Sequence, residues 1–196
     1  MRALRCVAVV CSVGLSGLPL VVVAQSPDTP FARMETLILT EGPNSVQLKG
    51  EGPSDLVMRG WRENFNAHGF YYYTFYVQHP DSEDGRARWE LVPFVTGSRF
   101  ENGIATSQGA DCILRDIRVL RPKQPPNPVI VVIADREMRG TYADSERVTF
   151  SIYELRKNTQ GIPGEPGIEF HRTRTITARL RYCDVSDAFA RELGIK

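Results

Sequence analysis

The side chains best suited to bind a small molecule lie in one short stretch of the sequence. Asp135, Arg136 and Glu137 follow an apolar run, and Tyr142 and Asp144 come shortly after, so charged and hydroxyl groups gather at one strand end. Such a group can recognise a polar ligand through charge-assisted hydrogen bonds. One alternative is an ion pair that stiffens the loop while the carboxylates cap the backbone. Another is a glycosidase that uses two of these carboxylates as a pair.

A second polar stretch, residues 62–69, leads into an aromatic run. We include Asn64, Asn66 and His68 from this stretch in the candidate binding surface. Asparagine in a loop more often builds a turn than contacts a substrate, so turn formation is the alternative role for this segment.

The sequence after residue 24 lacks the motifs of common exported hydrolases. It contains no Ser-x-x-Lys, Lys-Thr-Gly or Gly-x-Ser-x-Gly, which are the patterns of serine β-lactamases and of the nucleophile elbow. The histidines His68, His79 and His171 stand far apart, without the spacing of a local zinc site. We therefore predict that the chain has no catalytic residue and is not an enzyme.

The turn over residues 49–55 weakly resembles a calcium loop before a strand. Calcium prefers several oxygen ligands at regular spacing, but Lys49 and Gly50 occupy the early positions here. We predict an ordinary turn, and we predict neither a metal nor a cofactor for the chain.

The elements that must position these groups are predicted to be mostly β. Short runs rich in β-branched and aromatic residues alternate with Gly, Pro, Asn and Asp, a pattern typical of all-β proteins. The expected strands cover residues 35–40, 45–49, 55–61, 70–78, 88–95, 112–120, 128–134, 147–155 and 168–182. One short helix is expected from Asp184 to about Leu193, because Asp184 can cap its start and Gly194 fits a left-handed end.

Two of these runs are apolar at nearly every position. Residues 70–77 read Phe-Tyr-Tyr-Tyr-Thr-Phe-Tyr-Val, and residues 129–133 read Val-Ile-Val-Val-Ile. Since alternate side chains of a strand point to opposite faces, both strands should be covered on both sides. For the aromatic strand, a partner subunit, a ligand or a loop could supply the second cover.

The N-terminus has the pattern of a secretory signal peptide. Arg2 and Arg5 precede a short apolar run that ends at Ala24. We predict a signal peptide over residues 1–24, a flexible leader over residues 25–34 and a single domain over residues 35–196, located in the periplasm or secreted. An uncleaved membrane anchor is the alternative, but the run is short of the roughly 20 apolar residues that a span needs. After cleavage, no stable membrane insertion is expected.

Charge and cysteine content narrow the possible partners and the compartment. The 24 Lys and Arg residues nearly balance the 23 Asp and Glu residues, so the charge gives no reason to bind nucleic acid.

Cys6 and Cys11 lie in the predicted signal peptide, which leaves Cys112 and Cys183. In an oxidising compartment these two most simply form one disulfide, worth about 4 kcal/mol for a loop of that size. Two free buried thiols are the alternative.

Several short segments follow one another along the chain in an order that is characteristic of one protein family. They are NFNAHG (64–69), TFY (74–76), GADC (109–112), ADRE (134–137), YAD (142–144), VTF (148–150), GIPG (161–164), YCDV (182–185), DAF (187–189) and ELG (192–194). Together they resemble the CarG-like family of periplasmic carbapenem self-resistance proteins, over about residues 48–195.

This resemblance implies an antiparallel β-sandwich that forms a homodimer and protects its host from a carbapenem without hydrolysing it. We therefore expect an exported, non-catalytic protein that acts by binding or shielding, with a β-lactam or another small polar molecule as its ligand. The alternative is an interaction module of the cell envelope. Its interface would be the face that carries Tyr71 and Tyr73, or the face that carries Tyr72 and Tyr76.

Overall fold

The structure is a computed structural model that describes residues 31–66, 68–79, 86–109, 111–124 and 126–196. The predicted signal peptide and residues 25–30 of the predicted leader lie outside the described residues. Within the described part of the chain, no helix is both long enough and apolar enough to cross a membrane.

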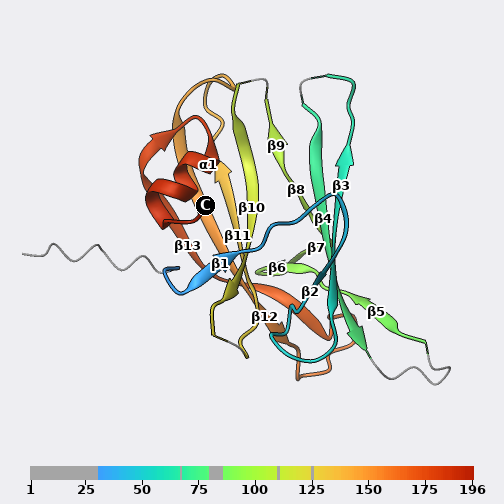
Figure 1. Cartoon of the computed structure of the whole chain (residues 1–196). Helices are drawn as coiled ribbons and strands as arrows, with labels where there is room; N and C mark the ends of the chain where they lie inside the picture. The colour runs from blue at the N-terminus through green and yellow to red at the C-terminus, as the bar shows by residue number, and fades with distance from the viewer. Residues whose placement is uncertain (1–30, 67, 80–85, 110, 125) are drawn as a thin grey trace, which may run out of the picture.

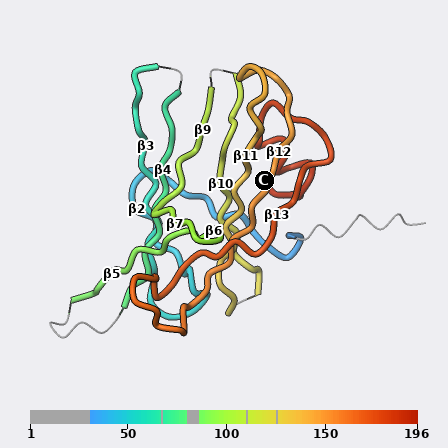
Figure 2. The backbone as a smooth tube through the Cα atoms, turned by 180° about the vertical axis from the view of Figure 1, so that it is seen from behind, coloured from blue at the N-terminus to red at the C-terminus, as the bar shows by residue number. Residues whose placement is uncertain are grey.

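Two sheets lie face to face, and the C-terminal helix lies on the far side of the larger sheet (Figures 1 and 2). The large sheet runs in the order β1 (Met34–Thr36), β10 (Ile113–Pro122), β11 (Ile130–Arg136), β12 (Glu146–Lys157), β13 (Ile168–Tyr182), β6 (Phe94–Thr96) and β7 (Arg99–Glu101), with β9 (Ser107–Gln108) also paired to β10. The small sheet runs β2 (Gly42–Val46), β3 (Asp55–Arg62), β4 (Phe70–His79) and β5 (Arg88–Leu91), with β8 (Ile104–Ala105) paired to β4.

Strand β11 of the large sheet is covered on both faces. It sends Val131 and Ile133 into the core between the sheets, where they join Phe75 from the small sheet. The alternate residues Val132 and Ala134 enter a second core beneath the helix. The predicted fold class, mostly β with one C-terminal helix, is therefore confirmed, as is the double burial of the run 129–133.

The second core also contains a residue from the predicted leader. Phe31 is 6% exposed and packs with Phe150 and Phe189 in this cluster. A turn joins it to β1, because the Met34 amide donates to the Phe31 carbonyl at 2.9 Å.

One strand pairing departs from the predicted antiparallel arrangement. β6 pairs in parallel with β13, and Phe94 lies opposite Phe170. The predicted single strand 88–95 is therefore wrong: β5 pairs with β4 in the small sheet, whereas β6 belongs to the large one. Pro93 separates the two strands, and a proline has no amide hydrogen to continue a ladder.

Three other predicted boundaries are also corrected. The strand expected at 45–49 ends at Val46, because a turn brings the Gly50 amide to the Gln47 carbonyl at 3.3 Å. The strand expected at 35–40 ends at Thr36, after which residues 37–40 lead to the small sheet. The expected helix is one α-helical turn, α1 (Val185–Ala188), followed by a π-helical turn, η1 (Phe189–Leu193).

Both predicted helix caps are confirmed. The Asp184 side chain accepts from the Ser186 amide, and Gly194 has a left-handed backbone with φ of 67°. The short strands β7, β8 and β9 were not predicted, because strands of two or three residues show no measurable alternation.

Among the described residues, the aromatic strand β4 has one face buried and the other partly exposed. Tyr73, Phe75 and Val77 are buried between the sheets. Tyr72, on the opposite face, is 41% exposed, and Tyr76 beside it is half-buried. The second cover expected for this strand is thus not supplied by the described residues of the same chain.

Candidate functional site

The predicted polar loop lies beside Tyr142, as the candidate surface requires. The rings of His68 and Tyr142 have centroids 4.9 Å apart. The two asparagines are engaged within the loop: Asn64 donates to the His68 carbonyl at 2.8 Å, and the Asn66 side chain accepts from the His68 amide at 2.8 Å. These two side chains therefore build the turn, which is the alternative role considered for them.

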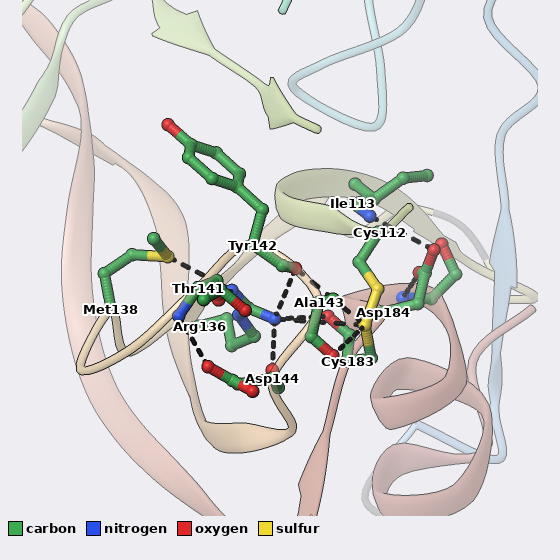
Figure 3. The surroundings of a disulfide bond; sticks show 11 residues. Cys112, Ile113, Arg136, Met138, Thr141, Tyr142, Ala143, Asp144, Cys183 and Asp184 are labelled. Carbon is green, nitrogen blue, oxygen red and sulfur yellow. Dashed lines mark hydrogen bonds between the residues drawn. A yellow bond between two sulfur atoms is a disulfide. The ribbon is translucent and has the colours of Figure 1, made fainter. Parts of the chain in front are cut away.

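Arg136 is enclosed by backbone carbonyls (Figure 3). This side chain is 5% exposed and donates to the carbonyls of Thr141 at 3.1 Å, Tyr142 at 3.0 Å and Cys183 at 3.3 Å, and also to that of Asp144. A guanidinium has five N–H donors, and here most of them meet protein oxygens. Arg136 thus fixes the turn 141–144 against the end of β13.

The nearby carboxylates have different partners. Asp144 accepts from the Thr141 amide at 2.5 Å, and this hydrogen bond lowers the pKa of Asp144. Glu137 pairs with Arg139 at 2.9 Å. Each acidic group thus stabilises the local backbone or balances a neighbouring charge.

Asp135 lies on the other face of β11, where it pairs with Arg115 at 3.2 Å. Burial raises the pKa of Asp135, and the Glu101 carboxylate adds to this effect, while Arg115 opposes it. The structure therefore brings His68 and Tyr142 together but divides the acidic residues between separate environments.

The disulfide between Cys112 and Cys183 is present, with their Cα atoms 5.7 Å apart. It connects the start of β10 to the end of β13, directly before the helix. The Asp184 carboxylate strengthens this junction by accepting from the Ile113 amide at 3.2 Å. The predicted pairing is confirmed.

A cavity of about 260 Å³ lies between the two sheets, at the edge of β10. Along this edge β10 pairs first with β9 and then with β1, and the cavity lies against the stretch between these pairings. Its apolar wall comes from Leu37, Leu39, Ile113, Ile117 and Val119.

Arg59 of β3 is the most informative residue in the cavity lining. Its Cζ lies 3.7 Å from the centroid of the Tyr71 ring, and its Nη1 donates to the Leu39 carbonyl at 2.7 Å. Its Nε is buried and has no hydrogen-bond partner. Among the described residues no carboxylate pairs with Arg59, so its charge faces the cavity without a counter-ion.

Other polar side chains in the cavity lining affect its hydrogen bonding and its net charge. Tyr73 is 6% exposed, burial raises the pKa of its phenol, and its hydroxyl has no hydrogen-bond partner in the described part of the chain. Asp116 and Arg118 also line the cavity, but they form an ion pair with each other. The net charge of the lining therefore comes from Arg59.

No prediction from the sequence concerned Arg59, and Tyr73 was expected only as part of a possible interface face with Tyr71, whereas the structure buries it between the sheets. A signal was present, since Arg59 occupies the same alternate phase of its strand as the buried residues Asp55 and Val57. A long cation in the inward phase of a strand indicates either a buried ion pair or a polar cavity. Only the arrangement of the two sheets distinguishes these possibilities.

No metal site is apparent among the described residues, where no cluster of three or more His, Cys, Asp or Glu side chains could hold an ion. At the end of the turn 49–55, which weakly resembles a calcium loop, Asp55 accepts from the amides of Leu48 and Gln78, each at 3.0 Å. It also pairs with Lys49 at 3.2 Å. Its carboxylate joins the turn to the neighbouring strand.

Comparison with known proteins gives one structural likeness. The chain matches no protein-family profile and no curated protein sequence. Its fold is similar to the crystal structure of CarG, with a TM-score of 0.66, 22% sequence identity, and coverage of 80% of this chain and 94% of CarG. At this identity the likeness establishes a CarG-like fold.

Proposed function

We propose that this chain is an exported, non-catalytic protein that protects its host cell from a β-lactam by binding the drug or shielding the drug's targets. The observation that carries the proposal is the fold shared with CarG, which extends over 94% of that protein. The ten sequence segments that resemble the CarG-like family support it independently. Fold alone does not fix function, so the proposal depends on a direct binding test.

A binding role fits the site better than a catalytic one. The acidic residues considered for catalysis engage a backbone amide or an arginine, as Asp144 and Asp135 do. The cavity, in contrast, has a cation and a phenol that are free to contact a ligand.

The test is a thermal-shift titration of the purified protein with a carbapenem and with other β-lactams. Mass spectrometry on the same samples measures whether the drug stays intact. A ligand present at 100 times its dissociation constant should stabilise the protein by about 2.7 kcal/mol. Stabilisation with intact drug supports binding. Hydrolysis of the drug by pure protein contradicts the proposal. No shift with any β-lactam contradicts its binding form and leaves only the shielding of targets.

Export has a separate test. The predicted cleavage after Ala24 would make Gln25 the first residue of the mature protein. N-terminal sequencing of protein recovered from the periplasm checks this directly. Recovery of uncleaved protein from the membrane fraction would favour the anchor instead.

We also propose that the protein is a homodimer formed through the outer face of the small sheet. Leu56 lies opposite Tyr76, and Tyr76 lies opposite Leu91, so three apolar side chains adjoin across three strands. Tyr72 and Trp89 on the same face are 41% and 44% exposed. Aromatic residues are enriched at interface cores, and a contiguous apolar face of this kind is typical of an interaction site.

Sedimentation analysis of the wild type and of Tyr76→Glu tests the homodimer. A dimeric wild type and a monomeric variant are expected, because the new charge would be buried without a partner. Arg147→Glu, an exposed change on the large sheet, serves as the control and should remain dimeric. A wild type that stays monomeric at high concentration contradicts this part of the proposal.

A further inference from the structure

We propose that the cavity between the two sheets binds a small molecule through its carboxylate, with Arg59 as the recognising cation. The inference deepens the proposed function, on which it rests for the premise that the protein binds a small molecule. The class of ligand is a monoanion with a compact apolar body.

The first step is the unbalanced charge of Arg59. This half-buried guanidinium has no carboxylate partner among the described residues, and its Nε–H is buried without an acceptor. A polar group removed from water is unfavourable unless it finds a hydrogen-bond partner, and a charge more so. A bound carboxylate would satisfy both the charge and the orphaned donor.

The second step is the fixed position of the guanidinium. The Tyr71 ring lies 3.7 Å from Arg59 Cζ, and the Leu39 carbonyl accepts from Nη1 at 2.7 Å. Tyr71 is itself held, because its hydroxyl donates to Glu41 at 3.0 Å and its amide donates to Thr106 at 2.9 Å. A cation held in this way loses little conformational entropy when a ligand arrives, which favours binding.

The third step is a second donor beside the first. The Arg59 Cζ lies 5.9 Å from the centroid of the Tyr73 ring, and Tyr73 lines the same cavity. Because burial raises the pKa of this phenol, its hydroxyl remains a donor at neutral pH. An ionised carboxylate only accepts hydrogen bonds, so a guanidinium and a phenol together match its needs.

The remaining lining sets the size and charge of the ligand. Arg118 neutralises Asp116, so one positive charge remains for the ligand, and a single carboxylate balances it. The walls at Leu37, Leu39 and Val119 favour an apolar body. At roughly 30 Å³ for each water, a volume of about 260 Å³ holds about nine waters or one compact organic acid.

The experiment uses protein labelled with ¹⁵N, so that the Arg59 Nε–H signal can be followed by NMR. Benzoate, its neutral analogue benzamide, and the carbapenem meropenem are titrated in turn. The variants are Arg59→Gln, Tyr73→Phe and the control Arg62→Gln. Arg62 is an exposed arginine at the end of the same strand. Tyr73→Phe removes only a hydroxyl, so it tests the site even if Arg59→Gln fails to fold.

Benzoate is expected to shift the Arg59 Nε–H signal, and benzamide at the same concentration is not. Affinity should fall at least tenfold in Arg59→Gln, severalfold in Tyr73→Phe, and remain unchanged in Arg62→Gln. If benzoate leaves the Arg59 signal in place, or binds all variants equally, Arg59 does not recognise a carboxylate and the inference is overturned.

The two proposals fail in distinguishable ways. If meropenem stabilises the wild type and Arg59→Gln equally and leaves the Arg59 signal unmoved, the protective function stands and this site is wrong. If benzoate binds at Arg59 but no β-lactam binds, the carboxylate site stands and protection by binding the drug is wrong.

Discussion

Two arginines, one in each sheet, differ in how far the protein itself satisfies their hydrogen-bond donors. Arg136 of β11 is buried and donates to four backbone carbonyls around the turn 141–144 and the disulfide. Arg59 of β3 is half-buried, donates to one carbonyl, rests on an aromatic ring and leaves its Nε without a partner. Both arginines leave a buried Nε without a partner among the described residues. The difference lies in the Nη atoms: those of Arg136 donate to four carbonyls, whereas those of Arg59 donate to one carbonyl beside a cavity.

The contrast explains why residue type alone did not point to Arg59. Arg136 lies in a cluster of charged residues, which made it the stronger candidate from the sequence. In the structure Arg136 and Asp144 bind backbone groups, and Asp135 and Glu137 pair with other arginines. The isolated Arg59 lines a cavity instead. Replacing groups in each region should therefore change different quantities: stability near Arg136, and ligand affinity near Arg59.

The largest expected effect concerns the disulfide that anchors the Arg136 region. Replacement of both Cys112 and Cys183 by serine should lower the free energy of unfolding by about 4 kcal/mol, because the bond closes a loop with a sequence separation of 71 residues. Urea denaturation of the variant and the wild type measures the difference. A loss below 1 kcal/mol would show that the Arg136 contacts hold this region without the covalent link.

Arg136→Met should have the next largest effect. The variant leaves the carbonyls of Thr141, Tyr142, Asp144 and Cys183 short of a donor, and the expected loss is about 3 kcal/mol. Arg139→Met is the matched control, since among the described residues the one ion pair of Arg139 is with Glu137 at the surface. This variant should cost less than about 0.5 kcal/mol. Equal losses in the two variants would contradict the structural role of Arg136.

Arg59→Gln should cost about 1 kcal/mol of stability. It removes one hydrogen bond to Leu39 and the contact with the Tyr71 ring, whereas Arg136→Met removes hydrogen bonds to four carbonyls. Thermal and urea denaturation of the variant give this value beside that of Arg136→Met. If Arg59→Gln is as destabilising as Arg136→Met, the distinction between the two arginines fails.

The smallest expected effect is a pH dependence at Asp144. Its pKa is lowered in the folded state by the hydrogen bond from the Thr141 amide. A carboxylate with a lowered pKa stabilises the fold above its unfolded pKa, and this contribution is lost as the pH falls through the folded value. Asp144→Asn should therefore be less stable than the wild type at pH 7, and the gap should close at acid pH. A gap that stays constant with pH would assign the effect to packing.

Sequence patterns predicted the fold well where long elements alternate or stay apolar. The run 129–133 became the doubly buried strand β11, and Asp184 and Gly194 bracket the helix as expected. The strand expected at 88–95 was split because sheet membership depends on distant partners, Tyr76 for Leu91 and Phe170 for Phe94. No local pattern contains that information.

The sequence grouped the 64–68 loop and Tyr142 in one candidate surface. It did not predict which of these side chains bind other parts of the protein and which remain free. Local chemistry predicts that asparagine can build a turn, and Asn64 and Asn66 do so. The cavity at Arg59 needs the crossing segment 37–40, β9 and β10 to meet, and these are distant in the sequence. Its polar character arises from this assembly.

The exchange of strands between the sheets has a consequence for folding kinetics. β5 and β8 pair with β4 in the small sheet, yet β6 and β7, which lie between them in the chain, belong to the large sheet. β6 can pair within the large sheet only after β13 has formed, because Phe94 lies opposite Phe170. The large sheet can therefore not be completed until β13 has formed, and contacts of such long sequence separation slow folding. The sandwich should fold slowly and unfold as one cooperative unit, so hydrogen exchange should report a single global opening for the central amides of both sheets.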